Sequence, residues 1–511
     1  MKNLHKYWII ICTFMLSVSC NNDAFFELER PNQFPWGNVK ELEIGVREAY
    51  YLLNRGPWDN AFGTIALKNF TESDIAVFLP QFVGASASAE YYNRLFSNAT
   101  PAYEMQDTFI ILYQMVTACN GPLQMLQNAA DAGEDPFPNM TEADHEKVNQ
   151  FKGELLYMRG LAYWYLARMY APPYDPNGAN DGRYFTLRRH FPSSSEEIKN
   201  PVLGSVAEVY AAIEEDWTHA KELLLENHSS VVNEANLRAR ANKYAASAML
   251  MRLYFITGRH NLAANEADYI ISSSQYDLSE NPIAAFNKNA NEGWGREVIW
   301  QTASDAASDA YGRTESIFSR NHYARDAQSS WSSQAMSHSA MKAVGWMAED
   351  LSETDEARKD LRYTQLYYRY DVDPRSELVP PMVWSYKYFR AADARRSNRP
   401  LIRLAEVFLT RSIIRFNNND KAGAASDLNV VRTRAGLDAI SAEDITADLI
   451  HNERIKELAT ENGDRTYYLI GLRLPIGIGD RDPARFSPIE APYANYYWQV
   501  PTVEKDLNGS Y

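Results

Sequence analysis

The sequence predicts a mostly α-helical protein in which helix pairs form a scaffold and a loop-rich region with short strands interrupts it. Apolar residues recur at three- and four-residue steps in many segments, including 39–54, 147–170, 206–225, 402–416 and 421–435. Between residues 278 and 399 this periodicity weakens, and Gly, Ser and Asn become frequent. The composition, 45% hydrophobic and 13% aromatic, is that of a globular protein.

The amino terminus carries the pattern of a secretory signal. Lys2 and Lys6 precede an apolar run over 7–18 that is too short to span a bilayer, and small residues then lead to Cys20. This ending resembles a bacterial lipobox. We therefore expect a signal peptide over 1–19, acylation of Cys20 and a lipid-anchored tether over 20–40, with plain cleavage near Ser19 as the alternative.

The N-terminal helical part is expected over 41–277. Helical spacing runs from Thr108 to Ala130, with an interruption expected at Gly121 and Pro122. Segment 242–271 is the clearest repeat unit, because its apolar and small residues fall at the offsets of the tetratricopeptide pattern. Such units bury their apolar faces only against neighbours, so the separate helix pairs should stack into one tetratricopeptide-like scaffold.

The inserted region, 278–399, is expected to face a ligand. Short strands are predicted over 297–302 and 382–389, and the loop 303–340 mixes aromatic with polar side chains. Aromatic rings can stack on the apolar faces of sugars, while Asn, Asp and Arg bind the hydroxyls. Trp164, Trp217 and Trp300 instead have the spacing of core residues. The candidate ligand-binding residues are Tyr311, Arg313, Asn321, Tyr323, Trp331, Trp294, Phe82 and Tyr91.

The C-terminal part, 400–511, contains a second helix pair and a closing segment. Pro400 suits the first turn of a helix over 402–416. Asp420 is placed to cap a second helix over 421–435, and Gly436 to end it.

Catalysis and nucleic-acid binding find little support in the sequence. A formal charge of −15 argues against a nucleic-acid partner. Zincin, nucleophile-elbow, phosphate-loop and paired-cysteine motifs are absent, so no catalytic residue, cofactor or metal cluster is predicted, although a calcium ion held by loop oxygens stays open. Glu453 and Glu457, one turn apart beside Arg454 and Lys456, favour a structural ion-pair network. Cys119 is expected to be a buried structural thiol.

Three blocks of the C-terminal part resemble the SusD/RagB family of lipid-anchored, outer-membrane nutrient-binding proteins of Bacteroidetes. The first two are R-L-A-E-x-x-L at 403–409 and L-N-x-x-R-x-R-A-G at 428–436, and the third is E-R-x-x-E-L-x-x-E at 453–461 followed by Gly463 and Arg465. Asn462 adds one residue to the third block, and Tyr468 stands where the family often has Asp. Weaker matches at 159–170, 360–362, 387–388 and 497–504 extend the resemblance over residues 20–511.

The resemblance implies a function in nutrient uptake. It implies a surface-exposed lipoprotein of the outer membrane that captures glycans without cleaving them and passes them to a SusC-type TonB-dependent transporter. Two alternatives stay open. The same architecture could capture peptides or another nutrient, and an α-helical glycoside hydrolase or polysaccharide lyase needs only two suitably spaced carboxylates.

Overall fold

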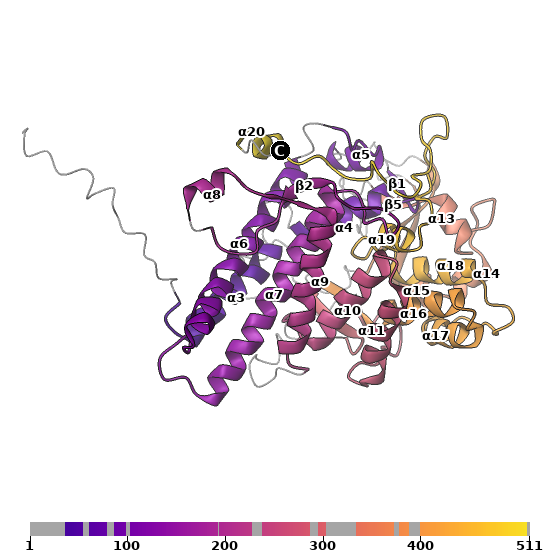
Figure 1. Ribbon diagram of the computed structural model, residues 1–511. Coiled ribbons are helices and arrows are strands. Elements are labelled where there is room, and N and C mark those ends of the chain that lie inside the picture. Colours follow the sequence, from indigo (N-terminus) through magenta and orange to yellow (C-terminus); the bar gives the residue numbers. More distant parts are fainter. Residues whose placement is uncertain are drawn as a thin grey trace, which may run out of the picture.

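Residues 36–54, 61–78, 86–98, 103–192, 194–226, 238–286, 295–302, 334–372, 378–387 and 399–507 are described by the structure, a computed structural model. Helices dominate these residues, as predicted (Figure 1). The predicted signal peptide and Cys20 lie outside them. Within the described part of the chain, no helix is both long and apolar enough to cross a membrane.

Eight helices form a continuous scaffold, and each packs on the next in the order α3, α6, α7, α9, α10, α11, α16, α17 (Figure 1). Their bounds are Val39–Asn54, Tyr103–Ala132, Glu142–Tyr170, Val206–Leu223, Lys243–Ile256, His260–Ser272, Leu404–Asn417 and Lys421–Arg434. The join between α11 and α16 brings together segments that more than a hundred residues separate. The structure thus confirms that distant helix pairs converge on one platform.

The α10/α11 pair matches the predicted repeat unit. Leu250 on α10 and Ala263 on α11 are buried at the positions where the pattern places a large residue over a small one, whereas the buried Ala267 stands where the pattern has Phe, so the match is partial. Gly258 between the helices has a φ of +75°, a left-handed conformation that favours glycine. The two helices can therefore approach closely and reverse direction within a few residues.

Side-chain caps fix where the scaffold helices begin. Thr141 and Asp144 form a reciprocal capping box, so α7 starts five residues before the expected Lys147. Ser205 and Glu208 do the same for α9. Asp420 accepts a hydrogen bond from the Gly423 N–H at the start of α17, as predicted. Gly436 after that helix has a φ of +87°, which confirms the left-handed stop.

Helix α6 corrects one prediction, because it runs without a break through Gly121 and Pro122. A proline inside a helix removes one hydrogen bond and costs about 3 kcal/mol. Here the buried stripe continues past it through Cys119, Leu123 and Leu126, and the Trp36 ring covers Gly121. Burial of this stripe outweighs the local cost.

The start of α16 corrects a second prediction. Residues Arg399–Arg403 form strand β8, which pairs antiparallel with β4, Val298–Thr302, and α16 begins only at Leu404. Every residue of both strands is buried. A short apolar run buried on all sides has no period that separates strand from helix, which explains the wrong assignment of Pro400. The strand predicted over 297–302 is confirmed.

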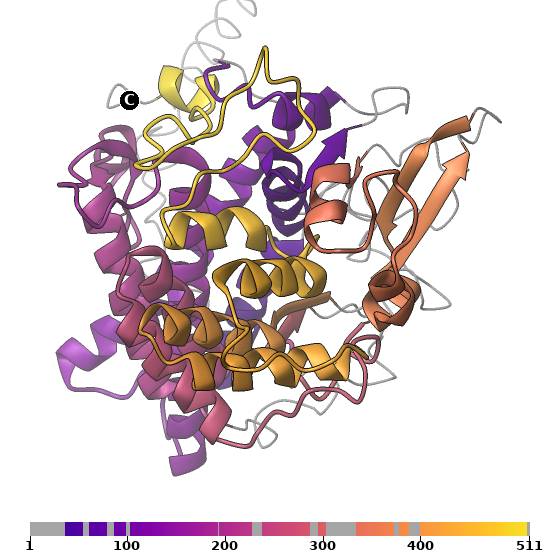
Figure 2. The ribbon, with the colours of Figure 1, turned by 90° about the vertical axis from the view of Figure 1, so that its right-hand side faces the viewer.

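A four-stranded sheet stands at one side of the helical scaffold (Figure 2). Its order is β1, β5, β7, β6, with bounds Ala76–Phe78, Gln334–Met336, Leu378–Ser385 and Tyr367–Val372. Strand β7 thus begins before the predicted Met382. Strand β1 comes from the N-terminal part, so the inserted region and that part share this sheet. A small hairpin, β2 and β3, spans Arg183–Thr186 and Leu203–Ser205.

The remaining described helices are short or lie close to the sheet and the C-terminal closing segment. Helices α18 and α19 pack between the scaffold and the inserted region and carry the third family-like block. The bounds of α4, α5, α8, α13, α14, α15, α18, α19 and α20 are Ala61–Glu72, Ser86–Tyr92, Ser195–Lys199, His338–Ala343, Asp355–Lys359, Leu361–Leu366, Ala447–Leu458, Asp464–Gly471 and Thr502–Leu507.

The core contains the residues that helical and strand spacing assigned to it. Trp164, Trp217 and Trp300 are fully buried, as predicted. Cys119 is also fully buried, and this burial raises its thiol pKa to about 12. The thiol is therefore protonated at neutral pH, in agreement with a structural role.

Candidate functional site

Two strand pairs hold the ends of the predicted ligand-facing loops. Phe78, the last residue of β1, pairs with Gln334, the first of β5. Thr302, the last of β4, pairs with Arg399, the first of β8. Segment 79–85 and the long segment 303–333 therefore leave the scaffold from neighbouring positions on the β1–β5 pair. Segments 303–333 and 388–398 are likewise anchored next to each other, at the end of the β4–β8 pair.

Most of the predicted ligand-binding residues lie outside the described residues. Seven of the eight fall in segments 79–85, 287–294 and 303–333, namely Phe82, Trp294, Tyr311, Arg313, Asn321, Tyr323 and Trp331. The structure describes only the backbone anchors of these segments. Their roles therefore stay predictions.

The structure argues against Tyr91 as a surface platform and favours its neighbour. Helix α5 directs Tyr91 into the core, where the side chain is fully buried and its ring packs edge-on against Trp498 at 5.5 Å between centroids. Tyr92 lies one position on and is only partly buried. Two adjacent tyrosines on a helix point about 100° apart, and periodicity over seven residues is too short to choose between them.

Tyr92 packs against a tilted aromatic ring and beneath a guanidinium at the sheet edge. The ring of Phe78 lies 5.9 Å away, and the Arg481 guanidinium lies 4.1 Å from the Tyr92 centroid. Arg481 is fixed there because it donates to the carbonyls of Tyr92, Ser73 and Thr71. Burial and the nearby Arg94 lower the pKa of Arg481 to about 10, so it stays charged at neutral pH.

The chemistry of this stack suits a hydroxylated apolar ring. Burial raises the pKa of Tyr92 above its usual value, so its phenol is neutral at pH 7 and can donate a hydrogen bond. Partly exposed aromatic faces bind the C–H faces of a sugar by dispersion. We call Phe78, Tyr92 and Arg481, with the neighbouring His338 and Asp480, the sheet-edge patch.

The other two residues of the sheet-edge patch are held by backbone contacts. Asp480 accepts hydrogen bonds from the N–H groups of His338 and Ser339, at 2.6 and 3.0 Å. The His338 ring contacts the Pro381 carbonyl on β7 at 2.8 Å. The carboxylate is therefore tied to the start of α13 and the imidazole to the middle of β7, which makes them fixed polar groups beside the sheet.

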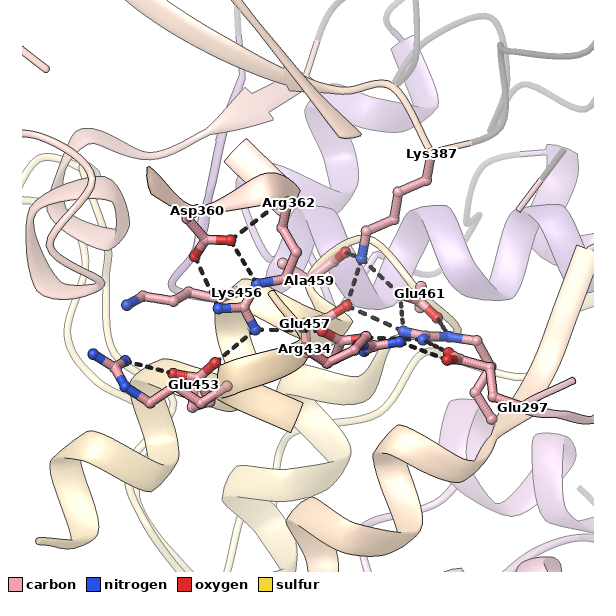
Figure 3. A network of polar contacts seen from close by, with 12 residues as sticks. Glu297, Asp360, Arg362, Lys387, Arg434, Glu453, Lys456, Glu457, Ala459 and Glu461 are labelled. Carbon is pink, nitrogen blue, oxygen red and sulfur yellow. Dashed lines mark hydrogen bonds and ion pairs between the residues drawn. The ribbon is translucent and has the colours of Figure 1, made fainter. Parts of the chain in front are cut away.

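A buried ionic network joins the loop anchors to the scaffold (Figure 3). Arg403 at the end of β8 binds Glu297 beside β4, Glu457 at 2.9 Å and Glu461 at 2.8 Å. Lys387, the last described residue before segment 388–398, donates to Glu461 at 2.6 Å. The network thus links both strands of the β4–β8 pair and the end of β7 to helix α18.

The same network extends across α18 to the inserted region and α17. Arg362 binds Asp360, Glu453 and Glu457, at 2.8, 2.6 and 3.3 Å. Arg434 on α17 binds Glu457 at 2.6 Å. All these side chains are almost inaccessible to solvent. Buried charges of this kind persist because each has several opposite partners.

Glu453 and Glu457 are structural, as the sequence predicted. Burial alone would raise the pKa of Glu457, but Arg434, Arg403 and Arg362 together lower it well below the usual range. A general acid needs a raised pKa and access to substrate, and Glu457 has neither. In the described part of the chain, His, Cys, Asp and Glu side chains form no group of three that could hold a metal ion.

Comparison with known proteins agrees with this architecture. Residues 70–255 match a family model described as starch-binding and associating with the outer membrane, and residues 380–467 match the model of the SusD family. The SusD-like protein P25 of Formosa agariphila is 24% identical over 403 residues, which cover 70% of this chain and 68% of the relative.

Solved structures share the fold. A SusD superfamily protein from Bacteroides thetaiotaomicron superposes with a TM-score of 0.74 at 20% identity, covering 92% of this chain and 98% of the other. A laminarin-binding SusD-like protein gives 0.68 at 19% identity, covering 93% and 98%. The helical scaffold, the buried family-like blocks and the two family matches lead to one conclusion: the chain belongs to the SusD/RagB family.

Proposed function

We propose that this protein captures glycans at the cell surface without cleaving them and delivers them to a SusC-type TonB-dependent transporter. Membership of the SusD/RagB family, together with the match to a model described as starch-binding and associating with the outer membrane, supports glycan capture at that membrane. The anchor would be lipid on Cys20.

The sheet-edge patch is the single observation that carries the proposed site. It lies where the β1–β5 pair holds the ends of segments 79–85 and 303–333 next to each other. Six of the eight candidate glycan contacts predicted from the sequence lie in these two segments. Ring stacking on Tyr92 and on Trp331 would bind sugar faces, while Arg313 and Asn321 would bind hydroxyls.

A glycan panel tests this function. Purified protein is titrated with laminarin, starch and other polysaccharides by calorimetry, because the relatives named above include a laminarin binder and the matched family model is described as starch-binding. Peptides serve as the competing cargo. We expect saturable binding of at least one glycan and none of the peptides. Binding of peptides alone would overturn the glycan assignment.

Two aromatic substitutions locate the site. Trp331→Ala and Tyr92→Ala should each weaken glycan binding about tenfold, or ~1.4 kcal/mol, because each removes a stacking face. Phe191→Ala is the matched control, since Phe191 is an exposed aromatic between β2 and α8, in a segment that does not belong to the four-stranded sheet. Equal affinities of wild type and both test variants would place the site elsewhere.

Two further measurements test the absence of catalysis and the partner. Incubation with the bound glycan should release no reducing ends, and release would instead favour a hydrolase. Affinity purification from the source membrane should recover the transporter as a stable complex. A lid that closes a barrel needs a large contact, on the order of 2,000 Å² or more.

A further inference from the structure

Arg168 on α7 contacts aromatic rings and, in the part of the chain that the structure describes, no carboxylate. Its guanidinium lies over the rings of Trp164 and Tyr467, 5.4 and 5.6 Å from their centroids. Among the described residues it has no hydrogen bond and no carboxylate within ion-pair distance. Burial lowers its pKa, but a guanidinium stays charged in proteins. Arg168 is only partly exposed, so its charge needs a counter-charge or water.

The Arg168 side chain lines a narrow cavity between helices α7, α10, α16 and α19. The cavity offers about 20 Å³ to a water-sized particle. One water needs ~10–15 Å³ in this measure, so the cavity holds a single small species. Tyr165, Arg252, Glu406, Asp464 and Tyr467 also line it.

The acids around this cavity are already neutralised by other cations. Glu406 accepts two hydrogen bonds from Arg252, at 2.7 and 2.6 Å. Asp464 accepts two from Arg454, at 2.8 and 2.5 Å. The remaining carboxylate of the lining, Glu461, is bound by Lys387 and Arg403 as described above. These oxygens therefore offer nothing further to Arg168.

The groups that lack a partner are all hydrogen-bond donors. The Tyr467 hydroxyl is buried, and no described residue forms a hydrogen bond with it. The Tyr165 hydroxyl likewise has none among the described residues. Burial raises the pKa of Tyr165 above its usual value and that of Tyr467 even further, so both phenols keep their protons at neutral pH. A surplus positive charge and unpaired O–H groups thus surround one small space.

We propose that this cavity binds a monatomic anion, chloride, with Arg168 as its principal ligand. Chloride is only slightly larger than water, accepts hydrogen bonds from any direction and supplies the missing negative charge. Water fills the same space but leaves the cation uncompensated. The bound anion would join three scaffold helices and α19, so the folded protein would be more stable in chloride than in a salt whose anion is too large to enter.

Thermal unfolding in two salts tests the site. The midpoint is measured in sodium chloride and in sodium gluconate at equal ionic strength, so that general screening cancels. For a chain of this size, chloride at about one hundred times its Kd should raise the midpoint by about 2–3 °C. The increment should saturate with chloride concentration. An equal midpoint in both salts would mean that the cavity holds water only and would overturn the proposal.

Charge variants and anomalous X-ray diffraction locate the bound anion. Arg168→Gln should abolish the chloride increment whatever its own midpoint, and Arg168→Lys should keep part of it. Arg485→Gln, at an exposed arginine, should keep all of it. Crystals of the wild-type protein soaked in bromide should show an anomalous peak beside Arg168. A chloride increment that persists in Arg168→Gln, or a wild-type crystal without that peak, would place the anion elsewhere and refute this site.

Discussion

Replacing Arg403 by methionine removes the charge at the centre of the buried network while keeping much of the side-chain volume. Arg403 contacts three carboxylates, those of Glu297, Glu457 and Glu461. Removing one partner of a buried ion pair costs about 3–5 kcal/mol, because the acids left behind are desolvated without a counter-charge. We therefore expect Arg403→Met to lower the free energy of unfolding by this amount.

Thermal unfolding measures this loss. With an unfolding entropy of ~2.1 cal/mol/K per residue, a chain of this length loses about 1 °C of midpoint per kcal/mol, so the expected drop is about 3–5 °C. Arg183→Met is the matched control, since Arg183 and Glu208 form an exposed pair with about half of each side chain accessible. Such pairs contribute ~0–1 kcal/mol. If both variants unfold at the same temperature, the network does not stabilise the fold as reasoned.

Three other outcomes are expected. Arg434, Arg403 and Arg362 lower the folded-state pKa of Glu457, so the stability that this carboxylate contributes is complete above its unfolded pKa of ~4.3 and is lost as the pH falls below that value. Glu457→Gln has no such carboxylate to protonate, and it should therefore lose less stability below pH ~4 than the wild type. Acid titrations followed by circular dichroism measure this difference. In protein that begins at residue 21, the remaining thiol, Cys119, should react with a thiol reagent only after unfolding, and fast reaction of folded protein would contradict its burial. Gly160→Ala should cost about 1–3 kcal/mol in chemical denaturation, since an added Cβ would lie 2.6 Å from the buried Trp217 Nε1; an unchanged midpoint would mean that this ring can shift.

Helical periodicity predicted most of the scaffold because its helices are long and bury one face. The two errors arose where that signal is weak or overridden. Pro122 carries a helix-breaking signal that the buried stripe through Leu123 and Leu126 overrides. Residues 399–403 are all buried, so their sequence shows neither the hydrophobic periodicity of a helix nor the alternation of a half-exposed strand.

The ionic network was predictable in kind, but its extent was not. Glu453 and Glu457 one turn apart beside basic residues indicated ion pairs. Their partners Arg362 and Arg403 lie far away in the sequence, and only the fold brings them together. The sequence could not show which of Tyr91 and Tyr92 faces the surface, for a similar reason. The orientation of a two-turn helix is set by the elements on which it packs.

Both ends of segment 303–333 are secured by backbone ladders, at Thr302 opposite Arg399 and at Gln334 opposite Phe78. Peptide groups form these ladders whatever side chains lie between the anchors, and lengthening a loop adds little entropic cost. If this segment contacts the nutrient as proposed, cargo preference and foldability would be decoupled. A lineage could then change the segment to bind a new nutrient while keeping the same scaffold.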